Sequence, residues 1–543
     1  MNCRTGSLSA RKFAIVLMFA CLTAVPLLAK GLGQSTATKD FQKTLTLGSN
    51  QTVSLTNKFG DVRIHGENAH EVKISATIRV QAHSQSDADR YVEQVRIDVS
   101  QDSSGVKIQT VYPDDSKFVV LRIGGPSYAV DYDISVPVDA KLWMKNSFGN
   151  AEVQGVQGWA ELEDSHGQLK FHDGGSAKLT NSFGEVQAAG ADGNVTVNNN
   201  NGAVTVSSVK GTLEVKDRFA SITVNNVSSA VTISGGNGPV QVTDAGASKI
   251  NNSFGAVSAR NIHGELVVNN NNGTIDVDTV SGGTQLNTSF GEIRFANVSG
   301  NVRCTSSNGR VSGKKTGGDV YVKTTFGEVA LEQIGGGVEV EDSNGGINVK
   351  EIKGKASFNT SFGSIDAAGL PKGVRATTGN GRISLNDVGG DTYARTSFGS
   401  VDIRRVNGNL TIENSNGPVT AGEVKGDASA KTSFGSVTLD DVVGSITVDN
   451  QNGTVTVSAA RTSPGCKNIS LKTSFAPMQV RLPADAGYEV HARTSFGHIS
   501  SDLPVTATGT LGGDSLNGKI ANGGCTLSLT NSNGNIEILQ LSK

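Results

Sequence analysis

The stretch TSFGSVDIRRVNGNLTIENSNGPVTAGEVKGDASAKTSFG, residues 396–435, begins and ends with the same four letters and carries NSNG midway between them. Phenylalanine and asparagine therefore take turns at one position of a repeat. The repeat extends far beyond this stretch, with phenylalanines followed by Gly or Ala every 35 or 36 residues. Midway between them, a glycine follows His or Asn at the same intervals, so the true step is about 18 residues. The phenylalanines are Phe148, Phe183, Phe219, Phe254, Phe290, Phe326, Phe362, Phe398 and Phe434, and the glycines are Gly167, Gly202, Gly238, Gly273, Gly309, Gly345, Gly381, Gly417 and Gly453.

Within one step, the apolar residues are equally regular. Val401 and Ile403 lie two residues apart after Phe398, as do Leu410 and Ile412 later in the same step. Pairs with this spacing are typical of strands that bury one face. Glycines after each pair mark the places where the chain turns back. Each step is therefore predicted to form two short strands and two turns, with almost no room for a helix.

One such step cannot bury its apolar face alone, so consecutive steps must stack at about 4.8 Å and share a narrow core. The sequence therefore predicts an all-β fold, a single-stranded β-solenoid with about 18 residues per rung. The 18-residue coil of the hexapeptide left-handed helix would need apolar residues six apart, which this repeat lacks. We therefore expect a right-handed β-helix whose physical repeat is two rungs, about 36 residues.

The alternation of Phe and Asn has two explanations. If the position points inward at a corner, one benzyl group spreads over two layers above the smaller Asn. Ala394 and Ala430 lie four residues before Phe398 and Phe434, where the alternate rungs carry larger apolar residues, and this favours the inward position. The Asn also tolerates left-handed turn geometry, with a glycine after it. The alternative is an outward row of phenylalanines on the surface.

The chain divides into four predicted regions. Residues 1–33 resemble a secretory signal peptide, because a positive segment ending at Lys12 precedes the uncharged run 13–29. Residues 41–145 do not follow the step and are predicted to be a β-rich N-terminal cap with one helix near residues 86–95. Residues 146–455 are the regular solenoid, and residues 456–543 are irregular C-terminal rungs and a cap. After the signal segment, no integral membrane span is expected, and the location is predicted to be extracytoplasmic.

Charge and cysteine content narrow the classes of function. Arg4, Arg11, Lys12 and Lys30 are the charges of residues 1–30, so the remainder carries 44 cations and 50 anions. No basic stripe is present to neutralise phosphates, which argues against nucleic acid as a partner. Cys304, Cys466 and Cys525 remain after the signal segment and have no metal-ligand spacing. A bridge between Cys466 and Cys525 is compatible with an oxidising compartment but is not demanded by the sequence.

Several motifs together resemble the bacterial putative-adhesin family, a domain of unknown function. They are KFGDVRIHG (58–66), ISVPVDAKLWMKNSFGNAEVQG (134–155), the repeated TSFGSV and SNGPV, RLPADAGYEVHARTSFGHISSDLPV (481–505) and LTNSNGNIEIL (529–539). The likeness covers nearly everything after the signal segment, although this chain has an unusually long and regular run of rungs. The resemblance implies a secreted or envelope-associated β-solenoid, and it transfers no catalytic or binding residue.

Candidate chemical groups are few, and each has a structural interpretation. Asp440 and Asp441 are adjacent and are expected to point to opposite faces of a strand, unlike the paired acids of a glycosidase. Arg404 and Arg405 are expected to form a solvated bend. His166, beside Asp164 and Ser165, fills the Asn position rather than a catalytic triad. The remaining candidates are a metal site at His172 and Asp173 or at His491 and His498, and sugar-binding or hydrogen-bonded asparagine runs at 198–202 and 269–273.

The sequence therefore predicts no catalytic residue, no metal site and no cofactor. The expected function is that of a non-enzymatic secreted or cell-envelope β-solenoid, adhesin-like, which acts in surface attachment or envelope structure through extended repetitive faces. Its expected partners are cell-surface glycans, matrix or envelope proteins. The alternatives are a periplasmic or membrane-linked regulatory or scaffolding protein that binds one partner, and a polysaccharide-active β-helix enzyme.

Overall fold

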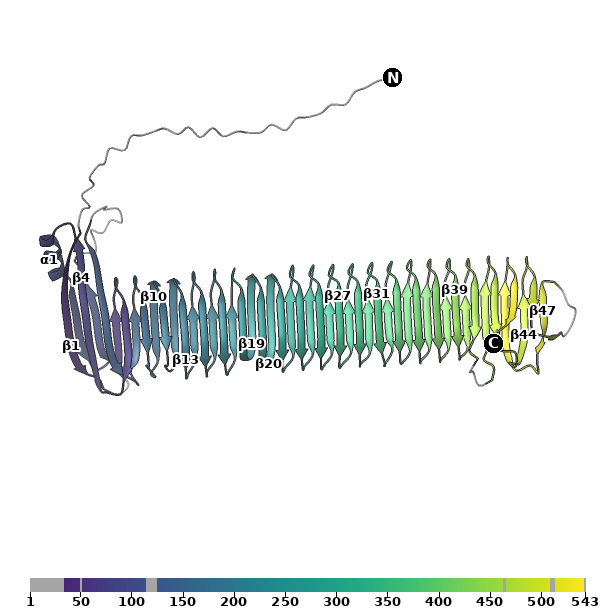
Figure 1. The fold of residues 1–543 in the computed structure, drawn as a ribbon, viewed down its shortest axis with the longest axis horizontal. Coiled ribbons are helices and arrows are strands. Elements are labelled where there is room, and N and C mark those ends of the chain that lie inside the picture. Colours follow the sequence, from purple (N-terminus) through teal and green to yellow (C-terminus); the bar gives the residue numbers. More distant parts are fainter. Residues whose placement is uncertain (1–33, 49–50, 114–124, 462–464, 508–512, 542–543) are drawn as a thin grey trace, which may run out of the picture.

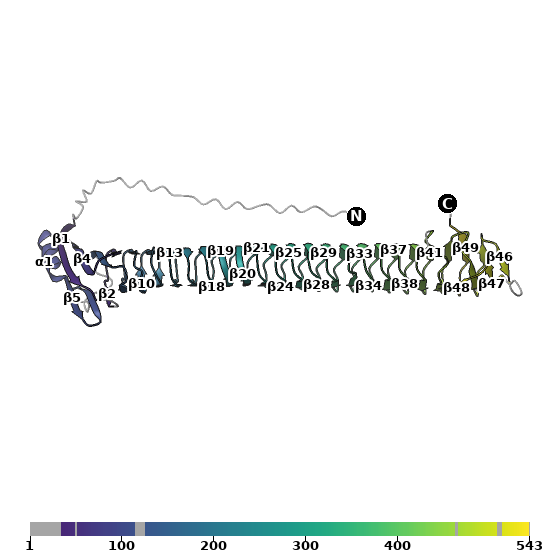
Figure 2. The ribbon, with the colours of Figure 1, turned by 90° about the horizontal axis from the view of Figure 1, so that it is seen from below.

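The computed structural model is a long, straight β-solenoid with a wider cap at its N-terminal end (Figures 1 and 2). It describes residues 34–48, 51–113, 125–461, 465–507 and 513–541. The predicted signal peptide, residues 1–33, lies outside the described residues. Most of the described rungs contribute two short strands, and each strand pairs with the strand two places further along the chain over most of the length. The predicted all-β solenoid is confirmed.

The strands form two faces, and each face is a ladder of parallel strands. In each ladder, a residue pairs with the equivalent residue of the next step. In the first face, Ala394 pairs with Ile412 and Ile412 pairs with Ala430. The first face contains β8 (Lys141–Lys145), β10 (Ala160–His166), β12 (Ala177–Phe183), β14 (Val195–Asn198), β16 (Leu213–Lys216), β18 (Val231–Ser234), β22 (Thr284–Thr288), β24 (Val302–Ser306), β26 (Val320–Lys323), β28 (Val338–Glu341), β30 (Ala356–Asn359), β32 (Val374–Thr377), β34 (Thr392–Thr396), β36 (Leu410–Asn414), β38 (Ala428–Lys431), β40 (Ile446–Asp449) and β42 (Ile469–Thr473).

The second face follows the same rule, with Val401 paired to Val419 and Val419 paired to Val437. Two longer strands, β19 (Val240–Phe254) and β20 (Val257–Asn272), run through both faces. The second face contains β9 (Ala151–Gln154), β11 (Leu169–His172), β13 (Val186–Ala191), β15 (Val204–Val209), β17 (Ile222–Val227), β21 (Ile275–Val280), β23 (Ile293–Val298), β25 (Val311–Thr316), β27 (Val329–Ile334), β29 (Ile347–Ile352), β31 (Ile365–Leu370), β33 (Ile383–Val388), β35 (Val401–Val406), β37 (Val419–Val424), β39 (Val437–Val442), β41 (Val455–Ala459) and β43 (Met478–Leu482).

The core is a thin layer of small and medium apolar side chains between the two faces. Val401, Ile403 and Val406 of one step are all at most 1% exposed, as the predicted pattern requires. Large side chains are matched by small ones in adjacent rungs. Phe295 pairs with Gly313, and a Cβ atom at Gly313 would overlap the Phe295 ring. Dense packing of the shared interior therefore needs small residues beside large ones.

The corner that follows the second face is built from residues in the left-handed conformation. One residue in each of many rungs has a φ between 51° and 61° although it carries a side chain. The equivalent positions Gly190 and Gly369 have φ values of 67° and 71°. Asn416 and Asn452 of the Asn-Gly turns do not have a positive φ, so the left-handed geometry that these asparagines were expected to tolerate is not used there. The residues with positive φ at the corner after the second face include Ser208, Asn226, Thr279, Asn297, Lys315, Gln333, Glu351, Asp387, Arg405, Glu423 and Asp441.

The N-terminal cap is a group of antiparallel strands joined to the first rungs. β1 (Ser35–Thr46) pairs with β4 (Glu71–Ala82), β4 pairs with β7 (Ser127–Pro137), and β5 (Arg96–Asp102) pairs with β6 (Gly105–Val111). β2 (Thr52–Thr56) and β3 (Val62–Glu67) instead pair in parallel with β8 and β9. Residues 52–67 therefore form a rung of the solenoid inside the range 41–145 predicted for the cap.

The predicted helix is present as α1 (Gln85–Gln94) and packs beside β1 and β4 (Figure 1). It begins two residues earlier than the Ser86 signal predicts, because the backbone N–H of Asp87 donates to the side chain of Ser84. Ala88 and Val92 are buried under the helix. Within the described part of the chain, no helix is both long and apolar enough to cross a membrane.

The last rungs are not stacked in the order of the sequence. β48 (Cys525–Asn531) pairs in parallel with β42 on one side and with β44 (Tyr488–Arg493) on the other. β49 (Ile536–Gln540) lies likewise between β43 and β45 (Ile499–Ser501). The final rung of the sequence is therefore inserted before the penultimate one. The antiparallel strands β46 (Val505–Ala507) and β47 (Ser515–Ile520) cover the edge beyond β44.

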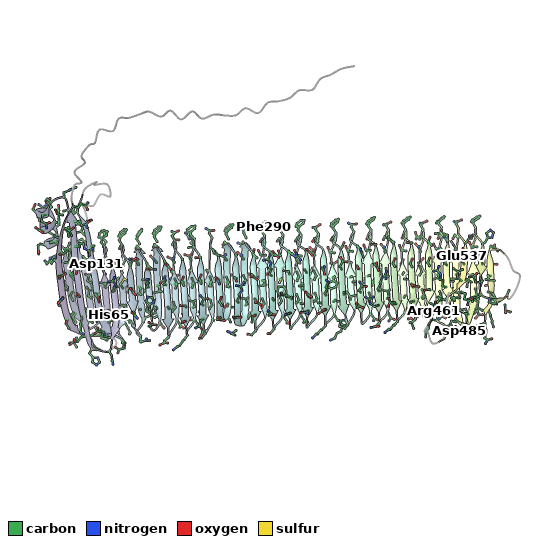
Figure 3. The ribbon with its side chains drawn as sticks, in the orientation of Figure 1. His65, Asp131, Phe290, Arg461, Asp485 and Glu537 are labelled. Carbon is green, nitrogen blue, oxygen red and sulfur yellow. A yellow bond between two sulfur atoms is a disulfide. The ribbon has the colours of Figure 1, made fainter. Side chains whose placement is uncertain are left out.

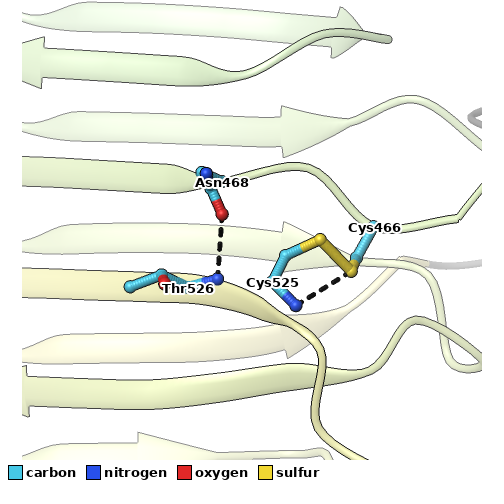
Figure 4. The surroundings of a disulfide bond; sticks show 4 residues. All are labelled: Cys466, Asn468, Cys525 and Thr526. Carbon is cyan, nitrogen blue, oxygen red and sulfur yellow. Dashed lines mark hydrogen bonds between the residues drawn. A yellow bond between two sulfur atoms is a disulfide. The ribbon is translucent and has the colours of Figure 1, made fainter.

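A disulfide bond joins Cys466 to Cys525 where the inserted rung begins (Figure 4). The backbone N–H of Cys525 also donates to Cys466 Sγ at 3.0 Å, and the N–H of Thr526 donates to Asn468 Oδ1 at 3.0 Å. The bridge that the sequence allowed is thus present. Cys304 is a free thiol buried in the core, and burial raises its pKa above the usual range.

Candidate functional site

A single file of phenylalanine and asparagine side chains runs along one corner of the solenoid, and we call it the corner row. Phe290, one of its members, projects from the long edge of the molecule in Figure 3. The eleven phenylalanines from Phe148 to Phe496 are between 44% and 79% exposed. In spatial order the row is Phe59, Phe148, His166, Phe183, Asn201, Phe219, Asn237, Phe254, Asn272, Phe290, Asn308, Phe326, Asn344, Phe362, Asn380, Phe398, Asn416, Phe434, Asn452, Phe475, Asn533 and Phe496.

The prediction that the phenylalanines point into the core is wrong, and the outward alternative is confirmed. Two residues before the Phe or Asn, a buried polar side chain occupies the inside of the corner in nearly every rung, and Gly235 is the departure. Asn414 Nδ2 donates to the carbonyl oxygens of Gly399, at 3.1 Å, and Gly417, at 2.8 Å. In the preceding rung, Thr396 Oγ1 donates to the carbonyl oxygen of Gly381 at 3.1 Å. Because these groups satisfy the turn backbone from inside, no space remains there for a benzyl group.

The glycine after each row residue has a steric reason. At Gly309, for example, an added Cβ would overlap the carbonyl oxygen of Gly291 in the rung below, and most of the equivalent glycines show the same contact. Ala220 and Ala476 are the departures from this rule. The buried polar residue and the glycine together fix the turn, so the side chain between them projects into solvent. The buried polar position was not predicted, although the sequence carries it at successive steps as Thr396, Asn414, Thr432 and Asn450.

One member of the buried polar position is a carboxyl group, Asp164, which is 1% exposed. Burial raises its pKa to about 7, and the backbone N–H of Ser165 offsets part of that rise. The adjacent rungs carry Asn146 and Asn181 at this position, and both donate to a glycine carbonyl. Burial likewise raises the pKa of Asp217 and of Asp342. An amide suits this position better than a carboxylate, because it can donate to the carbonyl oxygen.

We expect Asp164→Asn to stabilise these rungs at neutral pH. Between about pH 4 and pH 7, the folded chain holds a proton on Asp164 that the unfolded chain has released. The stability contributed by this group therefore falls as the pH rises through that window. Asp164→Asn is expected to increase the local free energy of unfolding by about 1–3 kcal/mol at pH 8, with little change near pH 4. Hydrogen exchange over residues 150–185 measures it, with the exposed Asp449→Asn as the control; an equal gain at both pH values would contradict it.

The spacing of the aromatic rings in the corner row differs between its N-terminal end and the rest of its length. At the N-terminal end, Phe59, Phe148, His166 and Phe183 fill consecutive rungs, and their rings stack with centroid distances of 5.3, 4.6 and 4.9 Å. Their planes lie within 15° to 18° of parallel. From Phe183 onward, every second place is Asn, so successive phenylalanines are two rungs, about 9.6 Å, apart. Half of the ring positions in this part of the row are thus left open.

The remaining sequence candidates do not assemble into a reactive site. His166 fills the Asn position as predicted, and it lies in the exposed row while Asp164 is buried. Asp440 and Asp441 are both exposed, so the expectation of opposite faces is wrong; the φ of 55° at Asp441 breaks the strand alternation. Arg405 forms an ion pair with Asp387 at 2.5 Å in the exposed bend that the sequence predicted.

The predicted metal and sugar candidates have structural partners. His172 Nε2 lies 3.6 Å from Glu152 Oε1, and His491 Nδ1 lies 3.2 Å from Asn517 Oδ1. Among the described residues, no three His, Cys, Asp or Glu side chains gather as metal ligands. In the run 269–273, Asn269 Nδ2 donates to the oxygen of the asparagine one rung below at 2.8 Å. Hydrogen-bonded asparagine ladders are therefore present in this run.

A shallow groove of about 1210 Å³ follows the left-handed corner between Lys315 and Lys425. Its walls carry charges of both signs, among them Glu351, Asp387 and Arg405. Arg405 and Asp387 form an ion pair, so these two charges are neutralised within the chain. The corner row is therefore the more distinctive surface of the described chain.

No family model matches the chain, and no curated protein matches it. Among solved structures, it is similar to a putative cell adhesion protein from Clostridium sporogenes, with 14% identity, a TM-score of 0.20, and coverage of 39% of this chain and 100% of that one. It is also similar to a putative adhesin from Parabacteroides distasonis, with 11% identity, a TM-score of 0.14, and coverage of 57% and 97%. Both of these structures are named for adhesion.

Proposed function

We propose that this chain is a non-enzymatic, extracytoplasmic, adhesin-like β-solenoid that attaches to surfaces or to other envelope components through its corner row. The observation that carries the proposal is the exposure of eleven phenylalanines in one file. From Phe59 to Phe496 the row is roughly 100 Å long at about 4.8 Å per rung. An exposed apolar surface of this extent is a mark of an interaction site.

The regular spacing supports attachment through many weak contacts rather than through one strong pocket. Each ring offers little binding free energy alone, but rings on one rigid scaffold bind with a high effective concentration after the first contact. The parallel ladders hold the spacing constant over the whole length (Figure 2). Secretion by the segment 1–33 is part of the proposal and follows from its sequence pattern.

The test is a deletion and complementation experiment in the cells that produce the chain. The row variant replaces Phe290, Phe326, Phe362 and Phe398 by Asn, the residue that alternate rungs already carry. It is expected to reduce attachment several-fold, whereas Phe326→Asn alone should change it less than about twofold. The control variant, Lys314→Asn with Glu332→Gln and Lys350→Asn, changes exposed residues of the second face and is expected to attach normally.

Attachment is scored as the fraction of cells retained on abiotic, matrix-coated and cell-coated surfaces, and cell fractionation locates the mature chain. A deletion strain that attaches normally on all three surfaces would refute the proposed function. A chain confined to the cytoplasm would refute it as well. Equal losses of attachment in the row variant and the control variant would show that attachment does not depend on the corner row.

A further inference from the structure

We infer that the partner of the corner row is the corner row of a second copy of this chain. In the resulting antiparallel pair, the phenylalanine rings of each copy enter the spaces above the asparagines of the other. This inference rests on the proposed function, since it names the partner of the same surface. It makes the chain self-associating, so that attachment between cells or fibres is homotypic.

The first support is the size of the open spaces. The rings of Phe59, Phe148, His166 and Phe183 show that one ring per rung makes a full stack with neighbouring centroids 4.6 to 5.3 Å apart. In the alternating part, successive phenylalanines are about 9.6 Å apart, so each space accepts one more ring at about 4.8 Å from both neighbours. A ring from outside would thus complete the same stack that the N-terminal rungs form within one chain.

The second support is the match of periods. A binding partner must present flat groups about 9.6 Å apart over many repeats to fill the spaces. A second copy has this period because it has the same sequence, whereas any other partner would match it only by coincidence. In an antiparallel pair offset by one rung, each Phe lies opposite an Asn of the other copy. The two-fold axis makes the interface self-complementary and closes it as a dimer.

The third support comes from the C-terminal end. There, Phe and Asn still alternate along the corner row although the rungs are not stacked in the order of the sequence. Phe475 and Phe496 are successive phenylalanines of the sequence, only 21 residues apart. The inserted rung places Asn533 between them, because its N–H donates to the carbonyl oxygen of Ser474 and the N–H of Phe496 donates to that of Ser532. The spatial order is therefore Phe, Asn, Phe, and the open space is kept.

The fourth support is charge. The residues directly before and after each member of the row, from Ser147 to Gly497, are uncharged except for Arg218. Like charges that face each other across an interface between identical chains would be destabilising. The edge therefore lacks the repulsion that would keep two copies apart.

The area is sufficient for a stable pair. An aromatic side chain buries 150–250 Å², and half or more of each ring is exposed at most places in the row. Eleven rings thus offer roughly 1,000 Å² per copy, or about 2,000 Å² for two copies. Specific stable interfaces bury about 1,200–2,000 Å² in total.

The first experiment measures the mass of the purified full chain by sedimentation equilibrium over a range of concentrations, at low and high salt. The wild-type chain is expected to be a dimer whose dissociation constant does not rise with salt, because no ion pair holds it. The row variant is expected to be monomeric, with a dissociation constant at least 100-fold higher, and the control variant is expected to remain dimeric. Far-UV circular dichroism confirms that each variant keeps its strands.

The second experiment determines the orientation by spin labels at Asn348→Cys and, separately, at Thr205→Cys, which follow Asn344 and Asn201 on the second face and lie outside the corner row. Asn348 lies near the middle of the alternating part, so its two labels in an antiparallel dimer are close together. Labels at Thr205, near one end, are then roughly 75 Å apart at about 4.8 Å per rung. A parallel pair would give short distances at both positions. Cys3 and Cys21 are replaced by Ser in both label variants, Cys304 is buried, and Cys466 is bridged to Cys525, so the native cysteines do not take up label.

A wild-type chain that stays monomeric at every concentration would overturn the inference, as would a dimer that the row variant leaves intact or short distances at both labels. A monomer that binds polysaccharides through the corner row, and loses this binding in the row variant, would overturn the inference while preserving the proposed function. A wild-type chain that stays monomeric, together with a deletion strain that attaches normally, would refute the inference and the proposed function together.

Discussion

Removal of the disulfide by Cys466→Ala and Cys525→Ala is expected to lower the stability of the C-terminal end by about 4 kcal/mol. The bridge closes a loop of 59 residues, and the cost of closing such a loop in the unfolded chain grows with its length. The loop contains β42 through β47, and β48 begins at Cys525 itself. The bridge therefore holds the inserted rung between two rungs that precede it in the sequence.

The measurement is hydrogen exchange and limited proteolysis of residues 525–540 in the oxidised wild-type chain and in the double variant. Exchange of the regular rungs between 146 and 455 is expected to change little, because in a repeat fold each rung contacts only its neighbours. Reduction of the wild-type chain should reproduce the effect, and the same reductant should leave the double variant unchanged. Equal protection of 525–540 in the oxidised and reduced wild-type chains would contradict this account.

The substitution Gly309→Val is expected to destabilise its rung by about 3 kcal/mol or more. A Cβ at this position overlaps the carbonyl oxygen of Gly291, which is backbone and cannot rotate away as a side chain could. To relieve the overlap, the two rungs would have to separate and lose ladder hydrogen bonds. The damage should therefore appear in the exchange rates of β22 to β25, the strands of the two rungs that would separate.

The matched control is Gly283→Ala, at the other turn of a nearby rung. The nearest atom to an added Cβ at Gly283 is the carbonyl oxygen of Asn301 at 3.9 Å, an ordinary contact. Its expected effect is within about 0.5 kcal/mol of zero. Similar melting temperatures and exchange profiles for Gly309→Val and wild type would show that the rungs can separate freely at this corner.

The rung and its core could be predicted from the sequence because their cause is local. Pairs such as Val401 with Ile403 are buried by the period of two in a strand, and the 18-residue step places each pair beside its equivalent. The predicted stacking of consecutive steps is confirmed by the register of β24 with β26, in which Val302 pairs with Val320. Whether the Phe side chain points into the core or into solvent could not be predicted in this way, because a Phe between polar residues and Gly is compatible with both directions.

The direction of the phenylalanines was decided by Thr396, Asn414 and their equivalents. Their side chains satisfy glycine carbonyl groups from inside the corner, and this leaves the benzyl groups outside. The alternation of alanine with larger residues had favoured phenylalanines that point inward. In the structure it instead serves core packing between adjacent rungs, where Ala394 lies beside Ile412. The candidate site therefore required hydrogen bonds that no spacing rule identifies.

By itself, the sequence determined the coil, its step, its buried positions and the identity of the side chains that share each place. Only the tertiary structure decided that residues 52–67 join the stack and that the rung at 525–540 enters it before residues 488–501. The reason is physical: a regular period specifies neighbours only while successive rungs are continuous in the chain. The chain also leaves the stack and returns to it. There, the position of the returning rung is determined by backbone hydrogen bonds with the exposed strand edges and by the disulfide at Cys466.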